Sequence, residues 1–256
     1  MKTLQLEFYK IKRRKVWLTV FAMLAVQMLW GMWSFRNPKD WELECGWMAL
    51  LYMVSLLDGV MMPTIMSVLA SRLADIEHKG NTYKQLETLR SAGSLYHAKA
   101  LCGSIIIAVM LIVQFAFFIT LGYYLGYLGH PDVKYYLLSY ILKLVSNLSL
   151  FLLQLLLSML FANQMIPLVA GLGGSMIALL LMFVSRYSFL PWGGNLNAAL
   201  VWMDWDEATR ICTYYYRDYS PAEMAAVVCI FVWAIVFYIA GRILVERKKY
   251  NPIHYD

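Results

Sequence analysis

Apolar residues fall into six long runs that are separated by shorter polar segments. The runs extend approximately over Val16 to Ser34, Met48 to Ala70, Ala100 to Tyr127, Tyr135 to Phe161, Pro167 to Ser185 and Pro221 to Leu244. A helix needs about 20 residues to cross the roughly 30 Å hydrocarbon core of a bilayer, and each run is about that long. Because lipid cannot hydrogen-bond free backbone groups, and the runs lack the alternation of a membrane β-barrel, each run predicts a helix. We therefore predict an all-α membrane protein, a single transmembrane domain over residues 1–256, with six transmembrane helices.

Composition and charge support this prediction and orient the chain. Hydrophobic residues make up 61% of the sequence, against roughly 45–50% in soluble domains. Lysine and arginine cluster before the first run, between the second and third runs, and after the sixth. The positive-inside rule then places both chain termini in the cytoplasm. The sequence pI of about 9.0 follows from this topology, so it does not indicate nucleic-acid binding.

The first 15 residues are expected to form a helix on the membrane surface. Leu4, Phe8 and Ile11 recur at helical spacing among lysines, as in amphipathic helices that lie on membrane lipid. The alternative is a disordered basic tail that is attracted to anionic lipid. The first apolar run is too long for a cleaved signal and has no cleavage site, so we interpret it as a retained span.

Chemistry-bearing motifs are scarce. The four histidines have no metal-ligand spacing, so we expect no metal site and no catalytic residue in this chain. No Walker A loop and no G-x-S-x-G motif occurs, which argues against an ATPase and against an intramembrane hydrolase. A disulfide between Cys45 and Cys212 stays open. Gly122 and Gly126 form a G-x-x-x-G pair that would suit a contact with a second permease, and the glycines at 170–176 would suit close helix packing.

A charged stretch between the second and third runs, residues 71–98, is expected to form a cytoplasmic coupling loop with its own short helix. Thr82 and Gln85 have the form of a capping box, and Gly93 suits a C-terminal stop. Such a helix would be about 15 Å long and would present a docking surface to a cytosolic partner. The alternative is a solvated connector.

The string ASRLADIEHKGNTYKQLETL, from Ala70 to Leu89, together with the basic N-terminus and six spans, resembles the ABC-2 type permeases that protect bacteria from lantibiotics. The motif residues that match are Asp75, Glu77, His78, Lys79, Gly80, Asn81, Tyr83 and Lys84, and Leu86 and Glu87 follow them. The resemblance implies that these residues couple the chain to a cytosolic ATPase dimer. That dimer would bind ATP and Mg²⁺, so this chain would need no cofactor. It further implies a second permease subunit, identical or different, in the bacterial plasma membrane.

The segment 186–220 between the fifth and sixth runs is rich in tryptophan and tyrosine. Such residues favour the headgroup level of a membrane, which predicts short interfacial or re-entrant helices on the outer side. A sharper hypothesis is an aromatic cap that receives a cationic amphipathic peptide. Its candidate residues are Trp192, Trp202, Trp205, Asp204 and Asp206.

Two charged residues lie inside predicted spans. Asp58 and Lys143 each lie roughly 12–15 Å below the outer boundary at 1.5 Å per residue, and Asn147 follows Lys143 by one turn. Charged residues at such depth usually face the bundle interior, where they pair or line a cavity. We expect Asp58 and Lys143 to pair if they are close laterally. The pair would then either fix how two helices align or take part in transport.

These observations predict the permease subunit of an ATP-driven exporter that expels lantibiotic peptide from the membrane. Another amphipathic antibiotic, a lipid-linked compound or an ion is an alternative cargo. A membrane immunity protein that binds peptide without pumping it is the alternative from a different class.

Overall fold

The computed structural model describes residues 2–36, 40–80, 91–161, 163–184, 188–207, 211–218 and 220–248. Its helices are α1 (Lys2–Arg14), α2 (Val16–Ser34), α3 (Asp40–Gly80), α5 (Ala92–Tyr124), α6 (Val133–Leu160), α7 (Met165–Val184), η1 (Pro191–Gly193), α8 (Gly194–Asn197) and α9 (Pro221–Lys248), and its strands are β1 (Val201–Asp206) and β2 (Ile211–Tyr216). Six of the described helices, α2, α3, α5, α6, α7 and α9, are long and apolar enough to cross a membrane. The prediction of six spans is confirmed.

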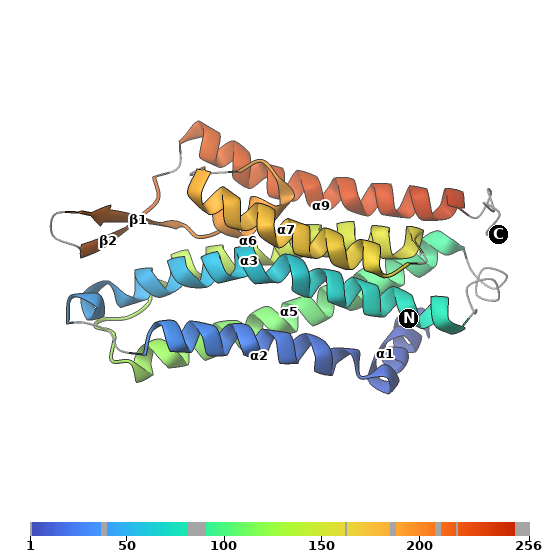
Figure 1. Ribbon diagram of the computed structural model, residues 1–256, viewed down its shortest axis with the longest axis horizontal. Coiled ribbons are helices and arrows are strands. Elements are labelled where there is room, and N and C mark those ends of the chain that lie inside the picture. The colour runs from blue at the N-terminus through green and yellow to red at the C-terminus, as the bar shows by residue number, and fades with distance from the viewer. Residues whose placement is uncertain are drawn as a thin grey trace.

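The six long helices lie side by side, and the two ends of the bundle differ (Figure 1). One end carries α1 and the last turns of α9, and we call it the basic end. The cationic residues of the segments at this end include Lys10, Lys12, Arg13, Lys15, Arg72, Lys99, Arg242 and Arg247. The opposite end carries the β1–β2 hairpin, and we call it the hairpin end. Since α1 and the end of α9 share the basic end, an even number of spans connects them.

Helices α3 and α5 extend further toward the basic end than the predicted spans. Helix α3 continues through Gly80, and α5 begins at Ala92, where the Ser91 side chain accepts a hydrogen bond from the Ser94 backbone. Gly93 therefore lies in the first turn of α5, and its predicted role as a helix stop is wrong. The predicted spans were ended where charged residues begin. Charged residues alone do not end a helix, which stops at signals such as proline or a glycine just past its last turn.

Small residues allow the long helices to approach one another. Gly171 of α7 lies against Ser67 of α3, and Gly103 of α5 lies against the Phe151 ring of α6. Close packing is thus confirmed for Gly171 and for Gly174, which lies against Trp192, but not for Gly173, where an added methyl group would contact no other described residue. In contrast, Gly122 faces Trp47 within the chain, and Gly126 follows the end of α5 with a φ of +77°. The G-x-x-x-G pair therefore does not form one helical surface, and its prediction as a permease contact is wrong.

Replacing Gly103 with alanine is expected to destabilise the chain by about 1–3 kcal/mol, because the new methyl group would overlap the Phe151 ring. Gly173→Ala is the matched control, since no described residue lies within 4 Å of a methyl group at that position. There the gain in helix propensity, about 0.5–1 kcal/mol, is unopposed. The midpoint of thermal unfolding in detergent separates the two variants. Equal midpoints would contradict the packing described for α5 and α6.

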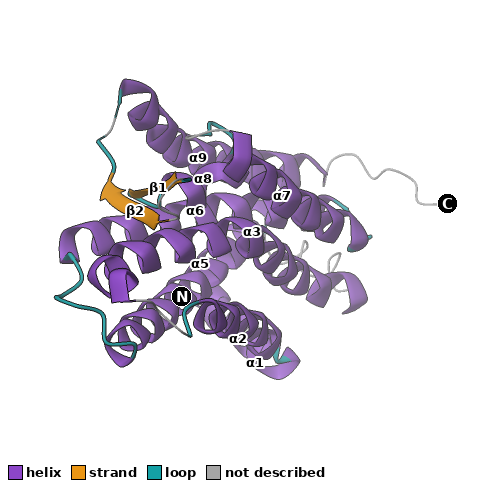
Figure 2. Cartoon of the chain, turned by 60° about the vertical axis from the view of Figure 1, so that its left-hand side comes forward, coloured by secondary structure: helices purple, strands orange, loops and turns teal. Residues whose placement is uncertain are grey.

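Strands β1 and β2 pair as an antiparallel hairpin, where interfacial helices were predicted (Figure 2). The register sets Val201 opposite Tyr216 and Asp206 opposite Ile211. Eight of the twelve strand residues are β-branched or aromatic, and such residues suit a half-buried pleated surface. The all-α prediction is therefore wrong at this hairpin. Cys212 of β2 and Cys45 of α3 form no disulfide with each other.

The short helices η1 and α8 precede the hairpin and enter the bundle from the hairpin end. Asn195 is fully buried, and Gly194 lies against Ser146 of α6. On the other side, Leu196 lies against Gly59 of α3. This re-entrant segment is therefore held between α3 and α6, and it brings a polar side chain to the middle of the molecule.

Candidate functional site

An ion pair lies in the middle of the bundle. Lys143 Nζ of α6 is 2.9 Å from Asp58 Oδ2 of α3, and neither side chain is exposed. The pairing that the sequence left open therefore forms. A charge in a helix centre costs about 2.5–3.5 kcal/mol on insertion scales, and pairing offsets part of that cost.

Amide side chains from three further elements gather around Asp58, two of them at its carboxylate. Gln27 of α2 and Gln114 of α5 both donate to Asp58 Oδ1, at 2.7 and 2.6 Å. Asn195 of α8 donates to the Asp58 backbone oxygen at 3.4 Å and to Asn147 Oδ1 at 3.1 Å. The mid-bundle hub comprises Asp58, Lys143, Gln27, Gln114, Asn147 and Asn195. One carboxylate thus links α2, α3, α5 and α6, and the re-entrant segment adds α8.

The hydrogen bonding of this hub is incomplete within the described residues. The buried hub atoms without a hydrogen-bond or ion-pair partner there are Gln27 Oε1, Gln114 Oε1, Asn147 Nδ2 and Asn195 Oδ1, and the neighbouring Ser146 Oγ also lacks one. Most buried polar groups in proteins are paired, and leaving one unpaired costs about 1–3 kcal/mol. A rearrangement that exchanges hydrogen-bond partners at the hub therefore costs less free energy than one that breaks a fully paired network.

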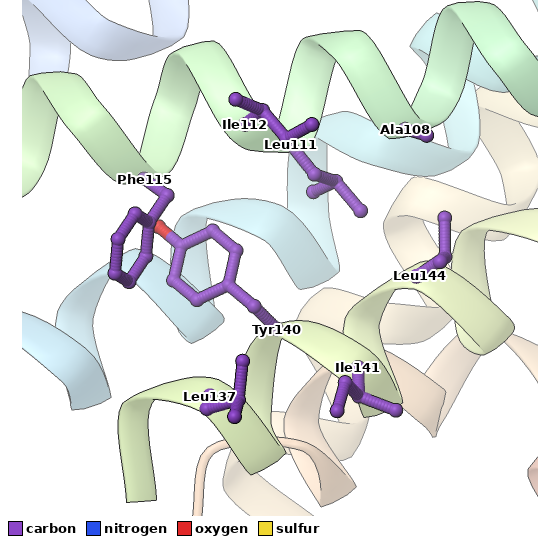
Figure 3. Close-up of a pocket in the computed structure, with 8 residues that line it drawn as sticks. All are labelled: Ala108, Leu111, Ile112, Phe115, Leu137, Tyr140, Ile141 and Leu144. Atoms are coloured by element: carbon purple, nitrogen blue, oxygen red, sulfur yellow. The ribbon is translucent and has the colours of Figure 1, made fainter. Parts of the chain in front are cut away.

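An apolar groove lies beside the hub, between α5 and α6 (Figure 3). It has a volume of about 260 Å³ and is lined by Ala108, Leu111, Ile112, Phe115, Leu137, Tyr140, Ile141 and Leu144. Tyr140 forms the boundary between groove and hub. Its ring meets Phe115 edge-on with centroids 5.0 Å apart, and Lys143 Nζ lies 4.7 Å from its centroid. The ring therefore adds cation–π stabilisation to the buried ammonium group and separates it from the groove.

A second buried ion pair fastens α1 to the basic end. Lys99 Nζ of α5 lies 3.0 Å from Glu7 Oε2 and donates to the Leu73 backbone oxygen of α3 at 2.7 Å. Burial alone would raise the pKa of the Glu7 carboxyl, but the charge of Lys99 and the hydrogen bonds from Lys10 and Lys99 hold it below its ordinary value. The first residues do form a helix, as predicted. Its buried face, however, includes Glu7 beside Ile11.

The predicted coupling residues fall into two groups. Asp75 is half-buried on α3, and the helix continues through Glu77, His78, Lys79 and Gly80. The others, Asn81, Tyr83, Lys84, Leu86 and Glu87, lie outside the described residues, as does the predicted capping box. The two helices that flank residues 81–90 are α3 and α5, and the Lys99 to Leu73 contact joins them at the basic end.

The structure separates the five residues of the predicted aromatic cap. Trp192 lies inside the bundle against Gly174 of α7. The register puts Trp202, Asp204 and Asp206 on one face of the hairpin and Trp205 on the other. Of the five residues, only Trp202, Asp204 and Asp206 can therefore act as one surface.

Sequence reasoning missed several members of these sites. Gln27 and Gln114 are amides within apolar runs, as Asp58 is a carboxylate within one, and the same test of polar residues at depth would have found them. Glu7 and Lys99 carried a weaker signal. Both lie in segments that are rich in charge, where a single buried pair does not stand out.

Six apolar helices around a buried polar hub define a multi-pass membrane protein. A family profile described as ABC-2 family transporter protein matches residues 3–185, more than half of the chain. The chain therefore belongs to the ABC-2 transporter family. It is a membrane permease, a component that lacks ATPase activity and generally pairs with an ATPase subunit. No curated protein and no solved structure matches the chain significantly.

Proposed function

We propose that this chain is a permease subunit of an exporter that protects a bacterium by removing lantibiotic peptide from its plasma membrane. It would work with a second permease chain and a cytosolic ATPase dimer that binds ATP and Mg²⁺. The family match supports a transporter, and the motif from Asp75 to Lys84 supports the lantibiotic branch. The basic end would face the cytoplasm, in accord with the positive-inside rule.

The observation that carries the proposal is the double connection between α3 and α5, the helices that flank residues 81–90. Lys99 of α5 binds the Leu73 backbone of α3 at the basic end, and Gln114 of α5 binds Asp58 of α3 in the middle. A displacement of residues 81–90 by a closing ATPase would therefore move both helices together and act on the hub.

The hub would convert this displacement into a change of helix packing. Asp58 is bound by Gln27 of α2 and by Lys143 of α6, so a shift of α3 changes contacts with both helices at once. Packed interfaces tend to switch between discrete arrangements and do not deform continuously. Two arrangements of the hub would then correspond to two states of the transport path.

A lipid-linked cargo is a second candidate, and the apolar groove between α5 and α6 favours it. Its lining offers no charge, and one tyrosine ring separates it from the hub. Such a groove suits an acyl chain. A peptide-binding immunity protein that does not transport would have no need of an ATPase dock.

The test is protection of cells that carry the chain with its ATPase and second permease. We expect these cells to survive a lantibiotic and to retain less labelled peptide in their membranes than cells without the chain. An ATPase variant that binds ATP without hydrolysing it should abolish both effects. Protection that persists with that variant would contradict export and would favour passive binding.

A further inference from the structure

A pocket of about 410 Å³ lies at the base of the hairpin, where β2 leads into α9. Its walls include Trp202, Tyr215, Arg217, Asp218 and Glu223. Trp202 and Tyr215 are directly opposite each other in the strand register and so share one face of the hairpin. The pocket therefore has an aromatic wall and a charged wall.

The charged wall is held in place by contacts of its own. The Arg217 guanidinium lies 4.6 Å from the Trp202 ring centroid and 3.3 Å from Glu223 Oε1. Glu223 Oε2 accepts from the Ser220 backbone at 2.9 Å, and Ser220 Oγ accepts from the Glu223 backbone at 3.3 Å. This reciprocal pair is a capping box at the start of α9. Arg217 and Glu223 thus neutralise each other and form a fixed part of the wall.

Asp218 supplies the charge that remains. Its side chain is exposed, and within the part of the chain that the structure describes its carboxylate has no ion pair or hydrogen bond. Asp204 and Asp206 lie on the same face of the hairpin as Trp202. The sequence from Val201 to Glu223 contains five acidic residues and two arginines. The pocket and its approach are therefore negative.

We propose that this pocket binds an ammonium or guanidinium side chain of a cationic amphipathic peptide, with Asp218 as its counter-ion and Trp202 and Tyr215 as its aromatic wall. Organic cations are attracted both to carboxylates and to aromatic faces. An anion is disfavoured, because Arg217 is already engaged by Glu223 and Trp202. The inference rests on the proposed function for the identity of the cargo, and it names the part of the cargo that this end of the chain recognises.

The experiment measures peptide binding without the ATPase. The purified chain is placed in nanodiscs of zwitterionic phosphatidylcholine, and empty nanodiscs give the lipid background. The probes are a synthetic amphipathic peptide with lysines and the same peptide with every lysine acetylated. We expect Trp202→Ala and Asp218→Asn each to raise the Kd for the lysine peptide about threefold to tenfold. Neither substitution should change the affinity for the acetylated peptide.

Two control variants match these substitutions. Trp205→Ala removes a tryptophan from the opposite face of the same strand, and Glu44→Gln removes an exposed carboxylate at the same end of the bundle. Both should bind the lysine peptide as the unaltered chain does. The proposal would be overturned if the chain bound the two peptides with equal affinity. It would also be overturned if Trp202→Ala and Trp205→Ala lost equal affinity for the lysine peptide. Unchanged binding by Asp218→Asn, an exposed position where misfolding is not expected, would overturn it as well.

Protection assays with the same variants distinguish this inference from the proposed function. A chain whose pocket binds the lysine peptide, but which gives cells no protection, supports the pocket and contradicts lantibiotic export. Full protection by Trp202→Ala and Asp218→Asn supports export and contradicts the pocket as the place where the peptide is recognised.

Discussion

Replacing Asp58 with asparagine is expected to destabilise the chain by about 3–5 kcal/mol, because the substitution leaves the Lys143 charge buried without its counter-ion. Two donated hydrogen bonds from Gln27 and Gln114 also lose their carboxylate acceptor. The loss should appear as a lower midpoint of thermal unfolding in detergent and as reduced protection of cells. Lys143→Met alone should also lower the stability of the chain, because the Asp58 carboxylate would then be buried without a cation.

The double variant distinguishes a pair from two independent residues. Asp58→Asn combined with Lys143→Met removes both charges, so it should restore much of the stability that either change loses. Ser104→Ala is a suitable control, because among the described residues the Ser104 hydroxyl binds the Ala100 carbonyl of its own helix and no other group. Strictly additive losses in the double variant would contradict the pair. A double variant that is stable but does not protect cells would assign the hub to transport as well as to folding.

Reversing the charge of Glu77 is expected to abolish most of the recovery of the ATPase with this chain. Glu77 belongs to the motif that ends α3, directly before residues 81–90. A lysine at that position would place a like charge where a complementary surface requires a carboxylate, and such juxtapositions cost several kcal/mol. The amount of chain in the membrane should not change, because Glu77 lies beyond the candidate span Glu42–Asp75. Affinity purification followed by quantification of both subunits measures the effect.

Glu44→Lys is the matched control for Glu77→Lys. It makes the same charge change at the opposite end of the same helix. The ATPase should be recovered with Glu44→Lys as with the unaltered chain. Equal recovery with Glu77→Lys would argue that residues 75–84 are a connector and not a docking surface.

The spans and the ion pair were accessible from the sequence because each depends on position along a helix. Apolar runs of sufficient length predicted all six long helices. Asp58 and Lys143 were matched in depth by counting residues at a fixed rise per residue. Depth alone left their lateral separation open, and only the packing of α3 against α6 brings the two side chains to 2.9 Å.

Other features depend on tertiary context that periodicity does not encode. The rotation of α2 and α5 about their axes decides that Gln27 and Gln114 meet Asp58. At the hairpin, tryptophan and tyrosine suggested interfacial helices, because these residues favour the membrane surface. Their high strand propensity was the competing signal, and pairing of β1 with β2 determined the outcome.

The most direct test of the account is ATP hydrolysis by the reconstituted assembly. The chain, its second permease and the ATPase are placed together in liposomes, and hydrolysis is measured with and without lantibiotic. We predict that the ATPase co-purifies with this chain, that the peptide raises hydrolysis several-fold, and that Glu77→Lys removes the increase. An ATPase that does not associate with the chain, or hydrolysis that is unchanged by the peptide and by Glu77→Lys, would contradict the proposal that this permease is an ATP-driven lantibiotic exporter.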